Sequence, residues 1–229
     1  MNIDVGAQIG AIRREVRNGE RDGKPVRAVV ATRTYDTTIE DLWDAISSPE
    51  RLTRWFTGIS GDLREGGRYQ LEGNASGTIT RCAPPRHLAL TWEYGGAVSW
   101  VEVRLDEDAA SGVRLVLEHT AEIDPHFGKY GPGAVGVGWD LSLVGLAEHL
   151  THGAAFDHAE GERWGLSDQG KDFIRQSSDG WCDASIEAGT DAREARAAAA
   201  QTTAFFTGAA SEADGIDSAD APAGERASD

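Results

Sequence analysis

The chain has 229 residues, of which 22 are Lys or Arg and 38 are Asp or Glu, so its formal net charge at pH 7 is −16. This length is sufficient for one domain with a sizeable hydrophobic core and an additional segment. The acidic balance argues against nucleic acid as a partner, because binding to phosphate needs a basic surface. No apolar run approaches the roughly 20 residues that cross a bilayer, and the N-terminal residues MNIDVGAQIG lack the basic-then-apolar pattern of a secretory leader.

The two cysteines, Cys82 and Cys182, lie far apart and form no CxxC pair. This spacing indicates neither a disulfide framework nor a cysteine zinc site. We therefore expect a reduced, cytoplasmic environment, no bound metal and no cofactor.

The N-terminal part predicts a β-hairpin followed by two short helices. Segments 11–20 and 26–34 flank an Asp22-Gly23 pair, which supplies the positive φ of a tight hairpin turn. The next segment, TTIEDLWDAIS, predicts a helix capped by Thr37 or Thr38. Pro49 then stands at the tolerated first position of a second helix, PERLTRWF.

Five strand patterns follow, each separated from the next by turn residues. They are segments 62–73, 76–83, 86–94, 98–106 and 112–121. Apolar and polar residues alternate in the last three, and the connections are short. This pattern is typical of an antiparallel sheet with one solvated face.

A Gly- and Pro-rich loop then leads into a long amphipathic helix at 139–158, with Asp140 and Glu148 away from its apolar face. This helix is the only predicted element long enough to cover the sheet. A strongly curved sheet around such a helix leaves a cavity between them, where small ligands usually bind.

The loop contains the string GPGAVG at 131–136, which matches the dinucleotide motif G-x-G-x-x-G. That motif requires a strand directly before it in a parallel βαβ unit, and the preceding strands are predicted to be antiparallel. We interpret the string as a flexible loop near the cavity mouth. His149 and His152 are three residues apart, but the third ligand of a catalytic zinc is missing, so we expect them to complement the helix dipole.

Beyond Gly161 the sequence predicts two more helices. One covers 168–188, and the other begins with a capping-box pair, Asp191 and Glu194. We expect residues 161–207 to form a helical appendage that packs on the domain at 1–160 through Trp181, Phe205 and Phe206; a dimerisation arm is the alternative. Residues 208–229 are small and acidic, and we expect them to be a disordered tail.

Several segments together resemble the START-like (SRPBCC) superfamily, and most closely its branch of activator of heat-shock-protein-90 ATPase homologues. These segments are VVATRTYDTTIEDLWDAISSPERLTRWF, REGGRYQLEG, PPRHLALTWEY, VRLVLEHTA and GWDLSLVGLAEHL. The resemblance covers about residues 26–151. It implies an α+β helix-grip fold, a curved antiparallel sheet wrapped around a long C-terminal helix. Members of the superfamily include lipid carriers, polyketide cyclases, hormone receptors and co-chaperones, so the resemblance specifies fold better than function.

Strand parity identifies side chains that face the expected cavity. If Leu117 faces the cavity, His119 faces it too, because it lies two residues further along the same strand. By the same rule, Tyr69, Arg81 and Ser99 are expected to face the cavity together with apolar residues two positions away. These four are the polar candidates. The complete set of candidate ligand-binding residues is Trp55, Phe56, Tyr69, Arg81, Trp92, Ser99, His119, Trp139 and Leu143.

We expect the protein to bind a small hydrophobic or amphipathic molecule in this cavity without required catalysis. One alternative is a polyketide cyclase or aromatase-like enzyme, with His119 or Tyr69 as acid or base and Arg81 polarising a carbonyl; it requires that these groups converge on one point of the cavity. The other is a co-chaperone-like protein-binding module, which requires a filled interior and an exterior patch near Trp100 or Trp181. The ligand, a second copy of the chain and a protein partner remain open as partners.

Overall fold

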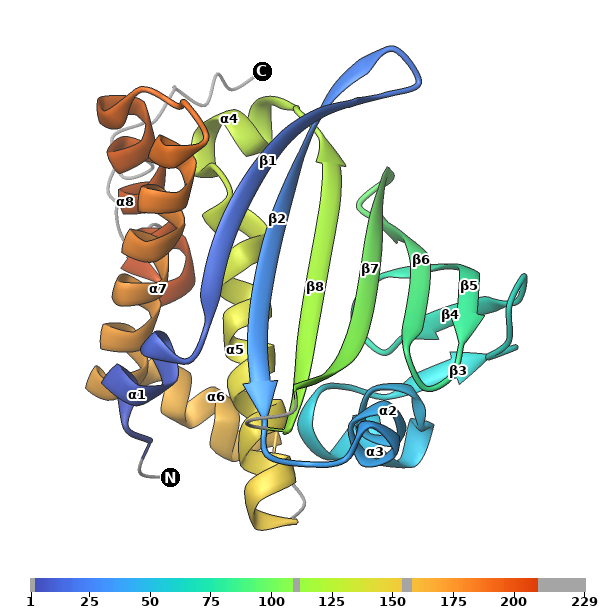
Figure 1. Cartoon of the computed structure of the whole chain (residues 1–229). Coiled ribbons are helices and arrows are strands. Elements are labelled where there is room, and N and C mark those ends of the chain that lie inside the picture. The colour runs from blue at the N-terminus through green and yellow to red at the C-terminus, as the bar shows by residue number, and fades with distance from the viewer. Residues whose placement is uncertain (1–2, 109–111, 154–157, 210–229) are drawn as a thin grey trace, which may run out of the picture.

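A single antiparallel sheet of eight strands forms the body of the molecule, in the spatial order β1-β2-β8-β7-β6-β5-β4-β3 (Figure 1). The computed structural model describes residues 3–108, 112–153 and 158–209. The strands are β1 (Arg13–Arg21), β2 (Lys24–Tyr35), β3 (Ile59–Gly61), β4 (Arg68–Leu71), β5 (Ser76–Ala83), β6 (His87–Tyr94), β7 (Ala97–Asp108) and β8 (Gly112–Glu122). The helices are α1 (Val5–Gly10), α2 (Ile39–Ser47), α3 (Pro49–Trp55), α4 (Pro125–Tyr130), α5 (Gly133–His152), α6 (His158–Leu166), α7 (Asp168–Glu187) and α8 (Ala192–Thr207).

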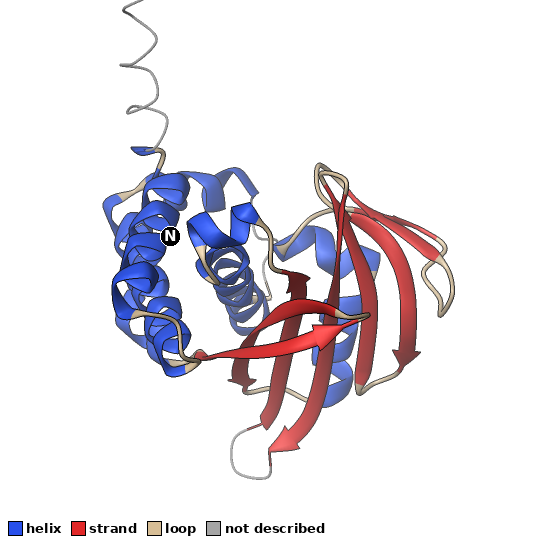
Figure 2. Ribbon diagram, turned by 90° about the horizontal axis from the view of Figure 1, so that it is seen from above, coloured by secondary structure: helices blue, strands red, loops and turns tan. Residues whose placement is uncertain are grey.

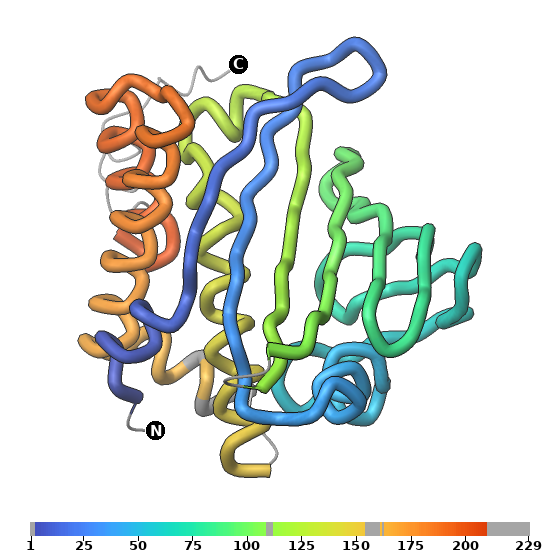
Figure 3. Tube along the Cα trace, viewed as in Figure 1, coloured from blue at the N-terminus to red at the C-terminus, as the bar shows by residue number. Residues whose placement is uncertain are grey.

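The sheet curves around the long helix α5, which lies against its concave face (Figure 2). The helix α7 lies beside α5 and next to β1, α8 packs on α7, and the N-terminal helix α1 also contacts α7 (Figure 3). This is the expected helix-grip architecture with additional C-terminal helices. Within the described residues, no helix combines the length and the apolar character needed to span a membrane.

Local sequence signals account for the turns and helix ends. Asp22 and Gly23 have φ of 52° and 77°, which are the positive values that the tight turn between β1 and β2 requires. Thr38 caps α2 by accepting a hydrogen bond from the Asp41 backbone, and Asp191 caps α8 in the same way. Gly153 ends α5 in the left-handed region. The predicted long helix therefore stops at 152, and residues 154–157 lie outside the described part of the chain.

Four parts of the chain differ from the prediction. The segment expected as one strand at 62–73 contains only β4; a tight turn precedes it, and the additional short strand β3 lies before that turn. The N-terminal helix α1 and the helix α6 were not predicted. Residues expected as a Gly- and Pro-rich loop form the helix α4 and the first turns of α5.

The glycines of the GPGAVG string are packing positions rather than a flexible loop. A Cβ on Gly136 would lie 2.4 Å from the ring of Trp181, and a Cβ on Gly133 would lie 2.9 Å from Thr202. Only glycine allows α7 and α8 to approach α5 this closely. The expectation of a mobile loop at this point was wrong, because a helix with a glycine face is stabilised by neighbours that the local sequence does not show.

α5 is buried on two sides, between the sheet and α7. Asp140, which the sequence placed away from the apolar face, is fully buried. Its Oδ2 accepts hydrogen bonds from Arg14 Nε at 2.7 Å, Ser177 Oγ at 2.5 Å and Trp181 Nε1 at 3.1 Å. One carboxylate thus joins β1, α5 and α7.

The C-terminal helices pack mainly through Trp181, which is completely buried. Phe206 is partly buried against the same core. Phe205 is 55% exposed, and its ring lies 5.5 Å from that of Tyr130 on α4. Of the segment expected to be an acidic tail, residues 210–229 lie outside the described residues.

The buried contact between Arg14 and Asp140 leads to a stability prediction. We expect Asp140→Leu to lower the free energy of unfolding by about 3–5 kcal/mol, because it leaves the Arg14 guanidinium buried without its counter-ion. Urea unfolding measures the change. The double variant Arg14→Leu/Asp140→Leu should recover part of the loss. As a control, Asp172→Asn at an exposed ion pair should cost about 1 kcal/mol or less. Equal stability of the Asp140→Leu variant and wild type would contradict this account.

Candidate functional site

An apolar cavity of about 150 Å³ lies between α5 and the part of the sheet formed by β3 to β8. Helices α2 and α3 close it from below, at the end where Figure 1 shows them crossing the sheet. Apolar side chains form almost all of its wall, and no charged residue of the described part of the chain lines it. Its volume is about that of a cavity that holds a benzene molecule, and it is partly open toward solvent.

Aromatic rings cover one side of the cavity. The Phe56 ring stacks on Trp139 with centroids 6.3 Å apart, and the Trp92 ring meets Trp139 edge-on at 5.3 Å. Trp55 adjoins Phe56 at 5.5 Å. These offset and edge-to-face arrangements are those that aromatic rings prefer, and they present both ring faces and ring edges to a planar ligand.

The structure places six of the nine candidate residues on the cavity wall: Trp55, Phe56, Tyr69, Trp92, Trp139 and Leu143. Ser99 and His119 lie behind this wall, and Arg81 lies outside it. The cavity is also lined by residues outside the nine candidates, among them Cys82, Ser142, Leu88 and Leu90. Leu88 and Leu90 share the parity of Trp92 on β6, so the alternation already contained the signal for these two.

Several polar atoms of the wall are already bonded within the protein. Trp55 Nε1 donates to the Ala45 carbonyl at 2.9 Å, and the Tyr69 hydroxyl donates to the Thr91 carbonyl at 2.7 Å. Burial also raises the pKa of Tyr69 well above its usual value, which keeps the hydroxyl protonated. These groups therefore support the wall and leave its inner surface apolar.

His119 belongs to a continuous hydrogen-bond chain behind the cavity. The Trp139 indole donates to His119 Nδ1 at 3.0 Å, and His119 Nε2 lies 2.8 Å from Ser99 Oγ. An indole N–H only donates, so Nδ1 accepts and Nε2 carries the proton. Ser99 then donates to the Trp92 carbonyl at 3.2 Å. This series of hydrogen bonds links the Trp139 indole to the backbone of Trp92.

Burial keeps this histidine neutral. It lowers the pKa of His119 from 6.5 to about 4, because the charged imidazolium would be removed from water with no nearby anion to stabilise it. The neutral form is also the one that accepts from Trp139. His119 therefore acts in the structure as a positioning residue.

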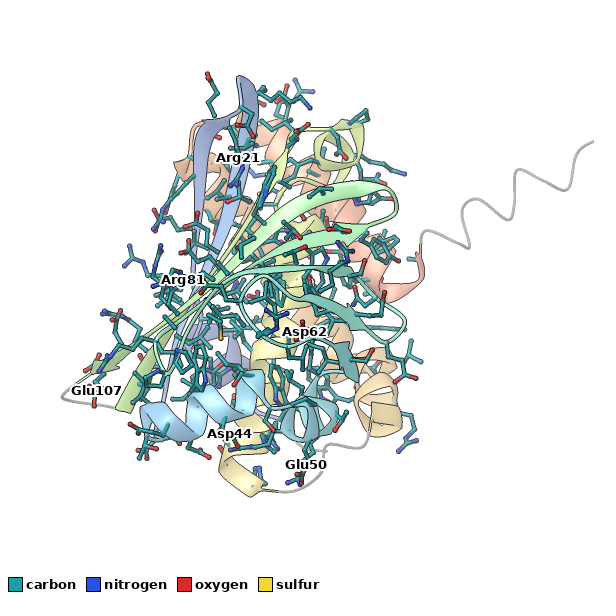
Figure 4. All side chains as sticks on the ribbon, turned by 90° about the vertical axis from the view of Figure 1, so that its right-hand side faces the viewer. Arg21, Asp44, Glu50, Asp62, Arg81 and Glu107 are labelled. Carbon is teal, nitrogen blue, oxygen red and sulfur yellow. The ribbon has the colours of Figure 1, made fainter. Side chains whose placement is uncertain are left out.

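Arg81 is the candidate that the structure contradicts. A bulge in β5 shifts its register with β6 between Ile79 and Arg81. Because one extra residue reverses the side-chain parity of a strand, Arg81 is exposed, lies 3.6 Å from Glu65 and points away from the cavity (Figure 4). Cys82 takes the inward position instead and lines the cavity as a free thiol.

Metal ligation has no support among the described residues, which contain no group of three or more His, Cys, Asp or Glu side chains arranged to hold an ion. His149 is buried and accepts a hydrogen bond from Arg51 Nε at 3.2 Å, whereas His152 is exposed at the end of α5. The two histidines therefore lie in different environments, one inside the protein and one at its surface.

A family model for the activator of Hsp90 ATPase homolog 1-like protein matches residues 36–151. This span runs from the end of β2 to the last turn of α5 and contains the whole cavity wall. The chain belongs to this family. The match leaves out the hairpin β1–β2, which is present here, and the helices α6 to α8.

Solved structures extend the similarity beyond the family model. The crystal structure of CalU16 from Micromonospora echinospora is 32% identical, with a TM-score of 0.60, and the match covers 76% of this chain and 98% of that chain. Its solution NMR structure gives 31%, a TM-score of 0.64, and 78% and 97% coverage. A conserved protein of unknown function from Enterococcus faecalis, 16% identical with a TM-score of 0.50, covers 69% of this chain and 90% of its own and shares the fold alone. A search of curated proteins gives no match.

The low pKa of His119 leads to a prediction for pH dependence. The unfolded chain takes up this proton near pH 6.5 and the folded chain only near 4, so between these values the unfolded state binds more protons and stability falls as pH falls. We expect this group alone to cost about 3 kcal/mol across that range.

The measurement is urea unfolding of wild type and His119→Gln at several pH values between 7 and 4. The glutamine amide can accept from Trp139 and donate to Ser99 but does not titrate, so the variant should lose less stability on acidification. His152→Gln, at an exposed histidine, should follow wild type. Parallel curves for wild type and His119→Gln would refute the role assigned to His119.

Proposed function

We propose that the protein binds a small apolar molecule in the cavity between the sheet and α5. The observation that carries the proposal is the partly open apolar space of about 150 Å³ with aromatic rings on one side. Burial of apolar surface, worth roughly 25 cal/mol per Å², would supply the affinity. Aromatic ligands fit the ring faces and edges of the wall best.

The arrangement of the polar groups favours binding over the cyclase-like alternative. That alternative needs His119 or Tyr69 together with Arg81 at one point of the cavity, but Arg81 is on the outside of the sheet. His119 and the Tyr69 hydroxyl are bonded to other protein groups. No acid–base pair of this kind faces the cavity.

The interior also favours binding over a co-chaperone-like module, which requires a filled core. Trp181 is fully buried and Trp100 lies beneath the guanidinium of Arg21, 3.9 Å from its ring centroid. Neither tryptophan therefore offers the free aromatic surface that the protein-binding alternative needs. The proposal of a small-molecule ligand retains the stronger support.

Titration with toluene or indole, followed by protein NMR and thermal unfolding, tests the proposal. A ligand present at about ten times its Kd should stabilise the protein by about 1.4 kcal/mol, and the shifted resonances should belong to residues of the cavity wall. We expect Leu143→Phe to fill the space and abolish binding, with Leu90→Phe as a second variant in case the first one overpacks.

The matched control is Val98→Phe, at a position that is 49% exposed and away from the cavity, and it should bind as wild type does. If wild type neither binds these probes nor gains stability, the proposal is wrong. If the probes do bind, native mass spectrometry of the purified protein is the route to a natural ligand.

A further inference from the structure

A second, larger hollow of about 670 Å³ adjoins the apolar cavity. It lies between the sheet domain and the C-terminal helices, and it is more open to solvent. Trp55, Phe56 and Ser142 line both spaces. These residues are the partition between the cavity and the second hollow, which we call the outer groove.

The helices beyond the family match build one wall of the outer groove. Trp164 and Leu166 of α6 and Phe206 of α8 line it, opposite Thr57 and Glu72 of the sheet domain. Leu166 is 68% exposed and adds apolar surface to this wall. The groove thus continues the apolar path from the cavity toward solvent.

Glu72 is the one charged residue among those that line the outer groove. Its backbone N–H donates to the Gly58 carbonyl at 2.8 Å, and its carbonyl accepts from the Thr57 hydroxyl at 3.1 Å. The carboxylate lies over Gly58, where an added Cβ would be 2.7 Å from Glu72 Oε2. These contacts hold the acid next to the loop that directly follows Phe56.

The Glu72 carboxylate makes no ion pair with any described residue. The other polar groups of the groove, Thr57, Asn74 and Ser142, are uncharged. A cation at the groove would therefore meet an available anion, whereas an anion would meet only repulsion.

We propose that the outer groove holds the polar end of the ligand, and that this ligand is an elongated amphiphile with an apolar end in the cavity and an ammonium group beside Glu72. The inference rests on the proposed function of the cavity. It assigns to α6 and α8 a share of the binding site, and it excludes fatty acids and other carboxylates as the preferred class.

Three probes with the same apolar body test the charge preference on the full chain: 6-phenylhexylammonium, 6-phenylhexan-1-ol and 6-phenylhexanoate. Calorimetry or NMR titration at low ionic strength gives each Kd, since salt screens an exposed charge. We expect the ammonium probe to bind about fivefold or more tightly than the carboxylate probe, as for one exposed ion pair, with the alcohol between them.

Glu72→Gln should bring the ammonium and carboxylate affinities together while leaving the Kd of the alcohol unchanged. The matched control is Glu65→Gln, which removes an equal charge from an exposed residue beside Arg81, outside the groove, and it should keep the preference. Leu166→Ala should weaken all three phenylhexyl probes and leave toluene unaffected.

Toluene separates the two levels of the proposal. If toluene does not bind, the proposed function of the cavity fails. If toluene binds but the three probes do not differ, or if Glu72→Gln and Glu65→Gln change the preference equally, the cavity function stands and the assignment of the outer groove is overturned. A preference for the carboxylate probe would overturn it as well.

Discussion

The structure depends on the burial of α5 between two different surfaces. One side lies against the concave face of the sheet, and the other lies against α7. A helix packed on both sides has no free polar face, so Asp140 is enclosed and must find all of its partners inside the protein. Arg14, Ser177 and Trp181 supply three hydrogen bonds to Oδ2, whereas Oδ1 is buried without a hydrogen-bond partner. The glycines at 133 and 136 complete the arrangement by allowing Trp181 and Thr202 to approach the helix.

As a result, α5 has a buried polar region on one side and an apolar cavity on the other. On the α7 side, the charged and polar groups converge on Asp140. On the side toward β3–β8, Trp55 Nε1 and the Tyr69 hydroxyl bond to backbone carbonyls and Trp139 Nε1 bonds to His119, so the surface that faces the cavity is mostly hydrocarbon and aromatic ring. The cavity is apolar because these polar groups are bonded to other parts of the protein.

Much of this could be predicted from local sequence. The alternation in β8 placed Leu115, Leu117 and His119 on the inner face, and the cap residues Thr38 and Asp191 marked helix starts at the observed positions. Arg81 shows the limit of parity: a bulge in the middle of β5 reverses every later side chain in that strand. No residue type in SGTITRCA announces the bulge, because it arises from the pairing with β6.

The sequence by itself determined the fold class, the curved antiparallel sheet and the aromatic residues that surround the space beneath it, because periodicity and turn chemistry act over a few neighbouring residues. Only the tertiary structure decided that the glycine string is a helix surface, that Asp140 is an interior ion-pair partner, and that the polar candidates Tyr69 and His119 face other protein groups. Those outcomes depend on residues that are far apart in the chain, such as Arg14, Asp140 and Trp181, and their mutual contacts exist only after α7 and β1 have packed against α5.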